Sequence, residues 1–119
     1  MIINKKKNIR RFKVGKTNEI TISEVAFIKL KANEQIVFYE KDSNYDFVKK
    51  DWGYYATPSI NGRLKKEGYK TALITNNEKK VYLTIVNKKK LNSFKKYCKK
   101  QNLKVYKWID TLKIKNNLF

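Results

Sequence analysis

The chain has 119 residues, 41% of them hydrophobic, which is enough for one domain with a modest core. Its 29 basic and 10 acidic side chains give a formal net charge of +19, so a partner of negative charge is expected. One cysteine excludes a disulfide framework, and the absence of histidine removes the commonest base for catalysis at neutral pH, so an enzyme is disfavoured.

The positive charge gathers at the two ends of the sequence. Residues 1–17 hold 7 basic side chains and no acid, and residues 88–119 hold 11 basic and 1 acidic. Residues 18–87 are nearly balanced, with 11 basic and 9 acidic side chains. Since 26 of the basic residues are lysines, which A/T-rich codons encode, part of the excess reflects codon composition. We therefore expect a polyanion to contact the ends of the chain rather than its middle.

No apolar run reaches the length of a transmembrane helix or of the apolar core of a signal peptide. The sequence therefore predicts a cytoplasmic protein, with peripheral membrane contact as a minor alternative. The carboxylates are scattered and Cys98 stands alone, so the spacing fits neither a metal site nor a catalytic pair. No catalytic residue, metal or cofactor is predicted.

The first half of the chain has β-branched and aromatic residues in short runs, which predicts strands. Residues 1–11 precede them as a basic, flexible arm. Residues 41–44 form a turn, because Asp and Asn side chains bond the nearby backbone. The connections are too short for crossover helices, so an antiparallel meander is expected. Its strands lie near residues 12–14, 19–22, 25–30, 35–40 and 45–49.

A first helix is predicted over residues 58–67. Thr57 suits the capping position, Pro58 suits the first helical position, and Gly68 suits the position just past the end. Apolar residues one turn apart give this helix a face that can pack on the sheet.

Two strands and a second helix follow. The runs 69–75 and 80–86 predict a hairpin, whose second strand has apolar residues on both faces and is therefore expected to be covered on both sides. Asn87 then caps a helix over about 88–101. For Leu103–Asp110 the composition favours a strand, although its apolar residues also fit a helical stripe.

These elements predict an α+β fold. An antiparallel N-terminal β-meander leads into an α-β-β-α-β unit, with two helices on one face of the sheet. The single α+β domain spans residues 12–110, and residues 111–119 form a basic tail.

The stretch Asp51–Leu64 departs from the lysine-rich background, with one Trp, two Tyr, the only Pro and two of the four Gly. Arg63 is the one arginine outside the first eleven residues, and its planar fork suits bidentate contact with an anion. It leans toward the start of the predicted helix, where free backbone N–H groups attract anions. The predicted pocket for an anionic ligand or partner is lined by Trp52, Tyr54, Tyr55, Ser59, Asn61 and Arg63.

The same residues also have a purely structural interpretation. In it, Arg63 forms an ion pair with Asp51 or Glu67, and Trp52 and Tyr54 are core residues. Both interpretations stay open at the level of sequence. An accessible Arg63 beside the start of the helix, with Tyr54 or Tyr55 lining the same concavity, would favour the pocket, and an Arg63 buried against Asp51 or Glu67 with no cavity beside it would favour the structural interpretation.

The segment Asp51–Leu64, followed at these spacings by Leu73–Thr75, Val81–Val86 and Trp108–Asp110, resembles a group of short uncharacterised bacterial proteins. Their genes often lie among surface-polysaccharide biosynthesis genes. The resemblance covers about residues 25–110. It implies an accessory role in surface-polysaccharide biosynthesis, and it brings no assigned activity and no catalytic residues.

Two binding functions follow from the sequence. The leading one is a non-enzymatic binding protein for an anionic ligand or protein partner at the predicted pocket. The alternative is unselective binding of RNA or DNA through the basic ends and the second helix, aided by Tyr97, Tyr106 and Trp108. The lysines expected to contact a polyanion are Lys88, Lys89, Lys95, Lys96, Lys99 and Lys100.

Overall fold

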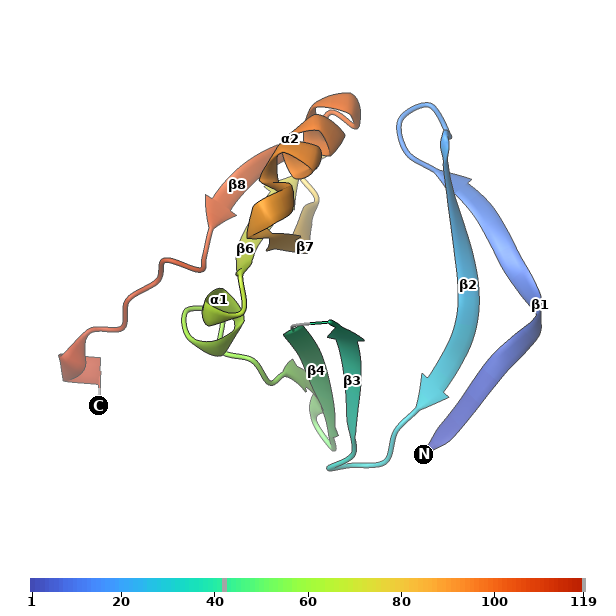
Figure 1. The fold of residues 1–119 in the computed structure, drawn as a ribbon, viewed down its shortest axis with the longest axis horizontal. Coiled ribbons are helices and arrows are strands. Elements are labelled where there is room, and N and C mark those ends of the chain that lie inside the picture. The colour runs from blue at the N-terminus through green and yellow to red at the C-terminus, as the bar shows by residue number, and fades with distance from the viewer. Residues whose placement is uncertain (42, 119) are drawn as a thin grey trace. The chain divides into compact units, whose positions relative to one another are not determined.

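The structure, a computed structural model, describes residues 1–41 and 43–118, and at Lys6 the backbone alone. Within these residues the strands form three small antiparallel sheets (Figure 1). The chain divides into two compact units, Met1–Thr57 and Pro58–Phe119, and each is described by itself. The fold is mainly β, and among the described residues only the second of the two predicted helices is longer than one turn, so the prediction of an α+β fold with two helices was wrong in that part.

The first unit begins with a long hairpin. Strand β1 (Ile2–Val14) pairs with β2 (Ile20–Lys29), and the register shifts once, between Lys5 and Arg10. The residues predicted as an arm are therefore the first part of β1. The turn uses Gly15 at φ 97°, a left-handed conformation that glycine adopts without strain.

The second sheet of this unit has the order β3-β4-β5, from β3 (Gln35–Glu40), β4 (Ser43–Lys50) and β5 (Gly53–Ala56). The prediction of a single N-terminal meander was wrong, because among the described residues β2 and β3 belong to different sheets. The chain changes direction between β2 and β3 at Asn33, which has a φ of 69°. The Asn33 N–H donates to the Lys49 carbonyl of β4 at 2.7 Å.

Two details of this sheet differ from the sequence prediction. Glu40 pairs with Ser43, so the loop is shorter than the predicted turn over 41–44, and Asp42 lies outside the described residues. Strand β5 was not predicted. It forms because Gly53, at φ 144°, lets the chain reverse and pair with the end of β4.

The second unit is built on a sheet of order β7-β6-β8 (Figure 1). Its strands are β6 (Tyr69–Thr75), β7 (Val81–Asn87) and β8 (Lys104–Trp108). The hairpin and the strand interpretation of the last segment are thereby confirmed. A short 3₁₀ turn, η2 (Asn116–Leu118), lies beyond β8.

The second predicted helix is confirmed. It consists of a 3₁₀ turn, η1 (Lys88–Lys90), and helix α2 (Leu91–Lys100). As predicted, Asn87 caps it, with its Oδ1 accepting the N–H of Lys89 at 2.9 Å.

Helix α2 covers one face of the β7-β6-β8 sheet. Residues directly opposite across neighbouring strands share a face, so Trp108 and Thr84 lie on the same side as Ala72. The Phe94 ring of α2 meets Trp108 edge-on at 5.9 Å between centroids, which places α2 over that side. The buried apolar residues of this unit are Leu64, Ala72, Ile74, Val86 and Cys98.

The other face of β7 is open. Val81 and Leu83 point to that face, and their side chains are 56% and 58% exposed. The prediction that this strand is covered on both sides was therefore wrong.

The predicted helix over 58–67 was also wrong, because α1 (Arg63–Lys66) is a single turn. Gly62 has φ −124° and ψ −102°, outside the helical region, so the helix cannot extend toward Pro58. A Cβ on Gly62 would overlap the Ser59 hydroxyl, so the Ser59 side chain would have to move. Thr57 does not cap the helix, since its hydroxyl donates to the Asp46 carboxylate at 2.9 Å.

Candidate functional site

The residues predicted to form one pocket belong to two units. Trp52, Tyr54 and Tyr55 lie in the first unit, and Ser59, Asn61 and Arg63 lie in the second. The ring contacts and hydrogen bonds of each group determine which of its side chains can bind a ligand.

The aromatic side chains lie where β4 turns into β5, and we call Trp52, Tyr54 and Tyr55 the aromatic hairpin. The Trp52 ring stacks on Tyr55 with a centroid distance of 6.1 Å. The Nζ of Lys49 lies 4.8 Å from the Tyr54 ring centre, within cation–π range. Trp52 is 67% exposed and Tyr54 63%, so the interpretation of these two as core residues was wrong.

The polar residues of the predicted pocket take part in local structure. The Ser59 hydroxyl accepts the backbone N–H of Arg63 at 2.8 Å, and the Asn61 amide donates to the Leu112 carbonyl at 2.9 Å. Because α1 has one turn, it lacks the aligned peptide dipoles that would attract an anion to its start. The side chain of Arg63 is exposed. Its role in binding an anion stays a proposal, and its pairing with Asp51 or Glu67 stays a prediction.

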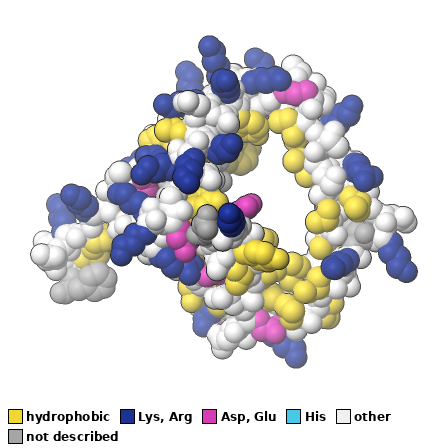
Figure 2. Space-filling view, viewed as in Figure 1, with side chains coloured by type: hydrophobic (Ala, Val, Ile, Leu, Met, Phe, Trp, Pro, Cys, Tyr) yellow, Lys and Arg dark blue, Asp and Glu magenta, His cyan; other side chains and the backbone are white. Residues whose placement is uncertain are grey.

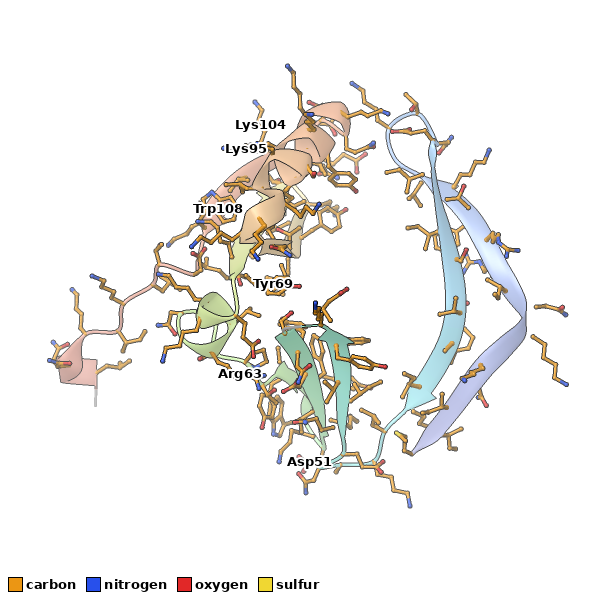
Figure 3. The ribbon with its side chains drawn as sticks, in the orientation of Figure 1. Asp51, Arg63, Tyr69, Lys95, Lys104 and Trp108 are labelled. Atoms are coloured by element: carbon orange, nitrogen blue, oxygen red, sulfur yellow. The ribbon has the colours of Figure 1, made fainter. Side chains whose placement is uncertain are left out.

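The lysines predicted for polyanion contact are all exposed, and we call them the lysine face: Lys88, Lys89, Lys95, Lys96, Lys99 and Lys100. They lie on η1 and α2. Figure 2 shows dark blue side chains gathered over the part of the second unit that holds α2 and β8. Figure 3 labels Lys95 on α2 and Lys104 at the start of β8.

Basic residues far outnumber acidic residues in the second unit. Residues 58–119 contain 17 basic and 3 acidic residues, a net charge of +14. Asp110 is only 2% exposed and lies 3.7 Å from the Lys70 Nζ, and one carboxylate oxygen of Glu67 is buried. Three acids against 17 basic residues therefore leave the potential of this unit strongly positive.

The aromatic residues predicted to stack on bases divide into two kinds. Tyr97 and Tyr106 are 46% and 70% exposed, so their rings are accessible. Trp108 is partly buried, packed against Phe94 with the Lys70 Nζ 4.6 Å from its ring centre. Trp108 is therefore part of the packing and not a free stacking surface.

A pocket of about 310 Å³ in the second unit had no signal in the sequence, because its lining comes from distant segments. One wall is the loop after β6, shaped by Asn76, whose Oδ1 accepts the N–H groups of Glu78 and Lys80 at 3.0 Å. The lining includes residues with polar side chains and one lysine. It consists of Thr75, Asn76, Asn77, Asn102 and Lys104.

Cys98 is buried on α2, and burial raises the pKa of its thiol. It is therefore held as a neutral thiol against the sheet. Across the part of the chain that the structure describes, no three His, Cys, Asp or Glu side chains are grouped to hold a metal ion. In the same residues, no helix has the length and apolar character needed to cross a membrane.

Comparison with known proteins finds no matching family model, no matching curated protein and no matching solved structure. The resemblance to proteins encoded near surface-polysaccharide genes therefore stays a prediction. Two exposed surfaces, the lysine face and the aromatic hairpin, are the candidate binding surfaces of this protein.

Proposed function

We propose that this protein is a non-enzymatic binding protein for an anionic polymer, and that its second unit makes the contacts. The observation that supports this most is the charge of that unit, +14 over residues 58–119, with every lysine of the lysine face exposed. Such a surface binds polyanions by displacing their condensed counterions.

The chemistry of the surface indicates how selective this binding is. Lysine acts as a mobile point charge and does not impose the planar geometry that arginine does. Contacts to phosphates or carboxylates are therefore insensitive to sequence, and the exposed rings of Tyr97 and Tyr106 add stacking on sugars or bases. We expect weak, unselective binding that falls steeply with salt.

Two kinds of polymer carry the required charge. Nucleic acid offers phosphates, and an acidic surface polysaccharide offers carboxylates and fits the accessory role that the resemblance implies. Fluorescence anisotropy with labelled single-stranded RNA, duplex DNA and an acidic polysaccharide, each over a salt series, compares them directly. A polymer bound only at low salt and without preference for sequence supports the proposal.

The decisive variant replaces Lys95, Lys96, Lys99 and Lys100 with Gln. The slope of log affinity against log salt should become shallower by about 3, since each lost lysine contact contributes roughly 0.7–0.9. A control replaces four exposed lysines of the first unit, Lys5, Lys13, Lys29 and Lys41, with Gln. Equal losses in both variants, or affinity that does not depend on salt, would contradict the proposal.

The aromatic hairpin supports a second candidate function, which we propose for the first unit. The stacked pair of Trp52 and Tyr55 is a rigid, exposed, apolar surface with polar edges, the composition typical of binding hot spots. A glycan or partner protein bound there should be lost in Trp52→Ala, whereas Tyr39→Ala removes another exposed ring of the same unit and serves as the control.

A further inference from the structure

The two edges of the β7-β6-β8 sheet differ in protection. At the β8 edge the register shifts opposite Leu73 and Ile74, and Lys104 and Lys107 lie within the strand. Bulges and lysines are the devices that keep an edge strand from pairing with another chain. Strand β7 differs, because its register with β6 is unbroken and it contains no charged residue from Val81 to Asn87, while Lys80 and Lys88 lie just beyond its two ends.

The backbone groups that β7 presents at its free edge can be assigned. The Lys88 N–H donates to the Gly68 carbonyl at 2.8 Å, and the Asn76 N–H donates to the Lys80 carbonyl at 3.2 Å. In an antiparallel pair, residues that bond the neighbouring strand alternate with residues that do not. Even-numbered residues of β7 therefore bond β6, and the odd-numbered residues Val81, Leu83 and Ile85 direct their N–H and C=O groups away from it.

The side chains of β7 are exposed on both faces. Val81 and Leu83 on one face and Tyr82 on the other are between 49% and 58% exposed. A strand added at this edge would cover part of all three, so it would gain apolar contact as well as backbone hydrogen bonds.

Charge indicates which strand fits. Lys79 and Lys80 precede β7, and Lys88–Lys90 follow it, with Glu78 as the one acidic neighbour in the loop. A second copy of β7 in antiparallel register would set lysines against lysines at both ends, and each copy brings a second unit of charge +14. A strand flanked by acids at both ends would pair favourably.

We propose that the free edge of β7 binds an extended, acidic segment of a partner protein as a fourth strand of this sheet. The interaction is distinct from polymer binding by the lysine face, because its affinity comes from backbone pairing in a fixed register. The partner segment has alternating apolar residues bracketed by Asp or Glu.

The first test uses the labelled synthetic peptide EEVTVTVEE as the probe and follows amide hydrogen exchange by NMR. The peptide should slow exchange at Val81, Leu83 and Ile85 by about tenfold or more, while Tyr82 and Thr84 are already slow without it. The peptide KKVTVTVKK should have no such effect. Odd-numbered amides that are protected in the free protein, or unchanged by the acidic peptide, overturn the proposal.

The second test uses variants of the full chain. Leu83→Pro removes one outward N–H and leaves the β6 bonds intact, so peptide affinity should fall about tenfold or more. Leu83→Thr keeps that N–H and should change affinity by less than about threefold. If Leu83→Thr weakens binding as much as Leu83→Pro, side-chain contact alone explains binding and the proposal fails.

Charge reversal gives a test that does not perturb the strand. Lys80→Glu with Lys88→Glu should weaken peptide binding about tenfold, and Lys113→Glu with Lys115→Glu, which change the net charge equally, should not. The Gln variant of the lysine face should keep peptide binding even where polymer binding is lost, so the two proposals can fail separately. Sedimentation that shows a dimer, disrupted by Leu83→Pro, would make a second copy the occupant and overturn the acidic partner.

Discussion

Two threonines in neighbouring strands should respond in opposite directions to the same substitution. Thr71 on β6 is completely buried, and its hydroxyl has no hydrogen-bond partner within residues 1–41 and 43–118. Thr84 on β7 is half-buried, and its hydroxyl donates to the Ala72 carbonyl at 2.9 Å. Valine has the shape of threonine without the polar group, so Thr71→Val should stabilise the protein and Thr84→Val should destabilise it.

The magnitude follows from the state of each hydroxyl. Burial of an unpaired hydroxyl costs about 1–3 kcal/mol in proteins, and valine removes that cost while keeping the β-branched shape, so Thr71→Val should gain about 1 kcal/mol. Loss of the Thr84 hydrogen bond should cost about 1 kcal/mol. For a domain of about 60–100 residues that unfolds cooperatively, each kcal/mol of stability moves the midpoint of thermal unfolding by roughly 4–8 °C.

Thermal and urea unfolding followed by circular dichroism measure both effects. The two variants should shift the midpoint in opposite directions, and the double variant should lie near the wild type, since the sites are on different faces of the sheet. A Thr71→Val variant that is less stable than the wild type by more than about 0.5 kcal/mol would refute the reasoning, because it would mean that the hydroxyl is satisfied.

Three further predictions concern single residues. Cys98 should resist thiol reagents at pH 8 until urea unfolds the chain, because burial raises the pKa of its thiol in the folded state alone; rapid labelling of the folded protein would contradict this. The contribution of this thiol to stability should decline as the pH rises above 9.0, the pKa of an unburied cysteine, because the unfolded chain then loses the proton first. Lys70→Met should lower stability by about 2 kcal/mol, because it leaves the buried Asp110 carboxylate without its cation. Asp110→Asn in the same background should recover most of that loss in urea unfolding. Arg63→Lys keeps the charge and loses the planar fork, so it should weaken binding of an acidic polysaccharide with little change in melting temperature; a fall in melting temperature without a change in binding would assign Arg63 a structural role.

Several elements could be predicted from sequence because their causes are local. Asn87 caps the second helix through a bond to the N–H two residues along, so the cap is encoded within three positions. The hairpin of β6 and β7 follows from two β-rich runs separated by a short polar loop. The strand preference of Leu103–Asp110 was confirmed because valine, tyrosine and tryptophan outweigh a helical spacing.

The candidate site was only partly predictable, because its side chains form hydrogen bonds and ring contacts with residues that are distant in sequence. Thr57 is a residue type that often caps helices, yet its hydroxyl donates to the Asp46 carboxylate, and the Asn61 amide donates to the carbonyl of Leu112. The sequence suggested that Trp108 stacks on the bases of a nucleic acid, but its ring contact with Phe94 makes it part of the packing between α2 and the sheet.

The sequence by itself determined most of the strands, the long helix and the regions where charge is concentrated, because propensity, capping and net charge act over a few neighbouring residues. Only the tertiary structure decided that α1 stops after one turn, that Trp52 is exposed, and that among the described residues β7 pairs with a neighbouring strand on one side alone. These outcomes depend on which strands pair and on which polar groups find partners across the fold, and such choices are made by contacts between segments far apart in the chain.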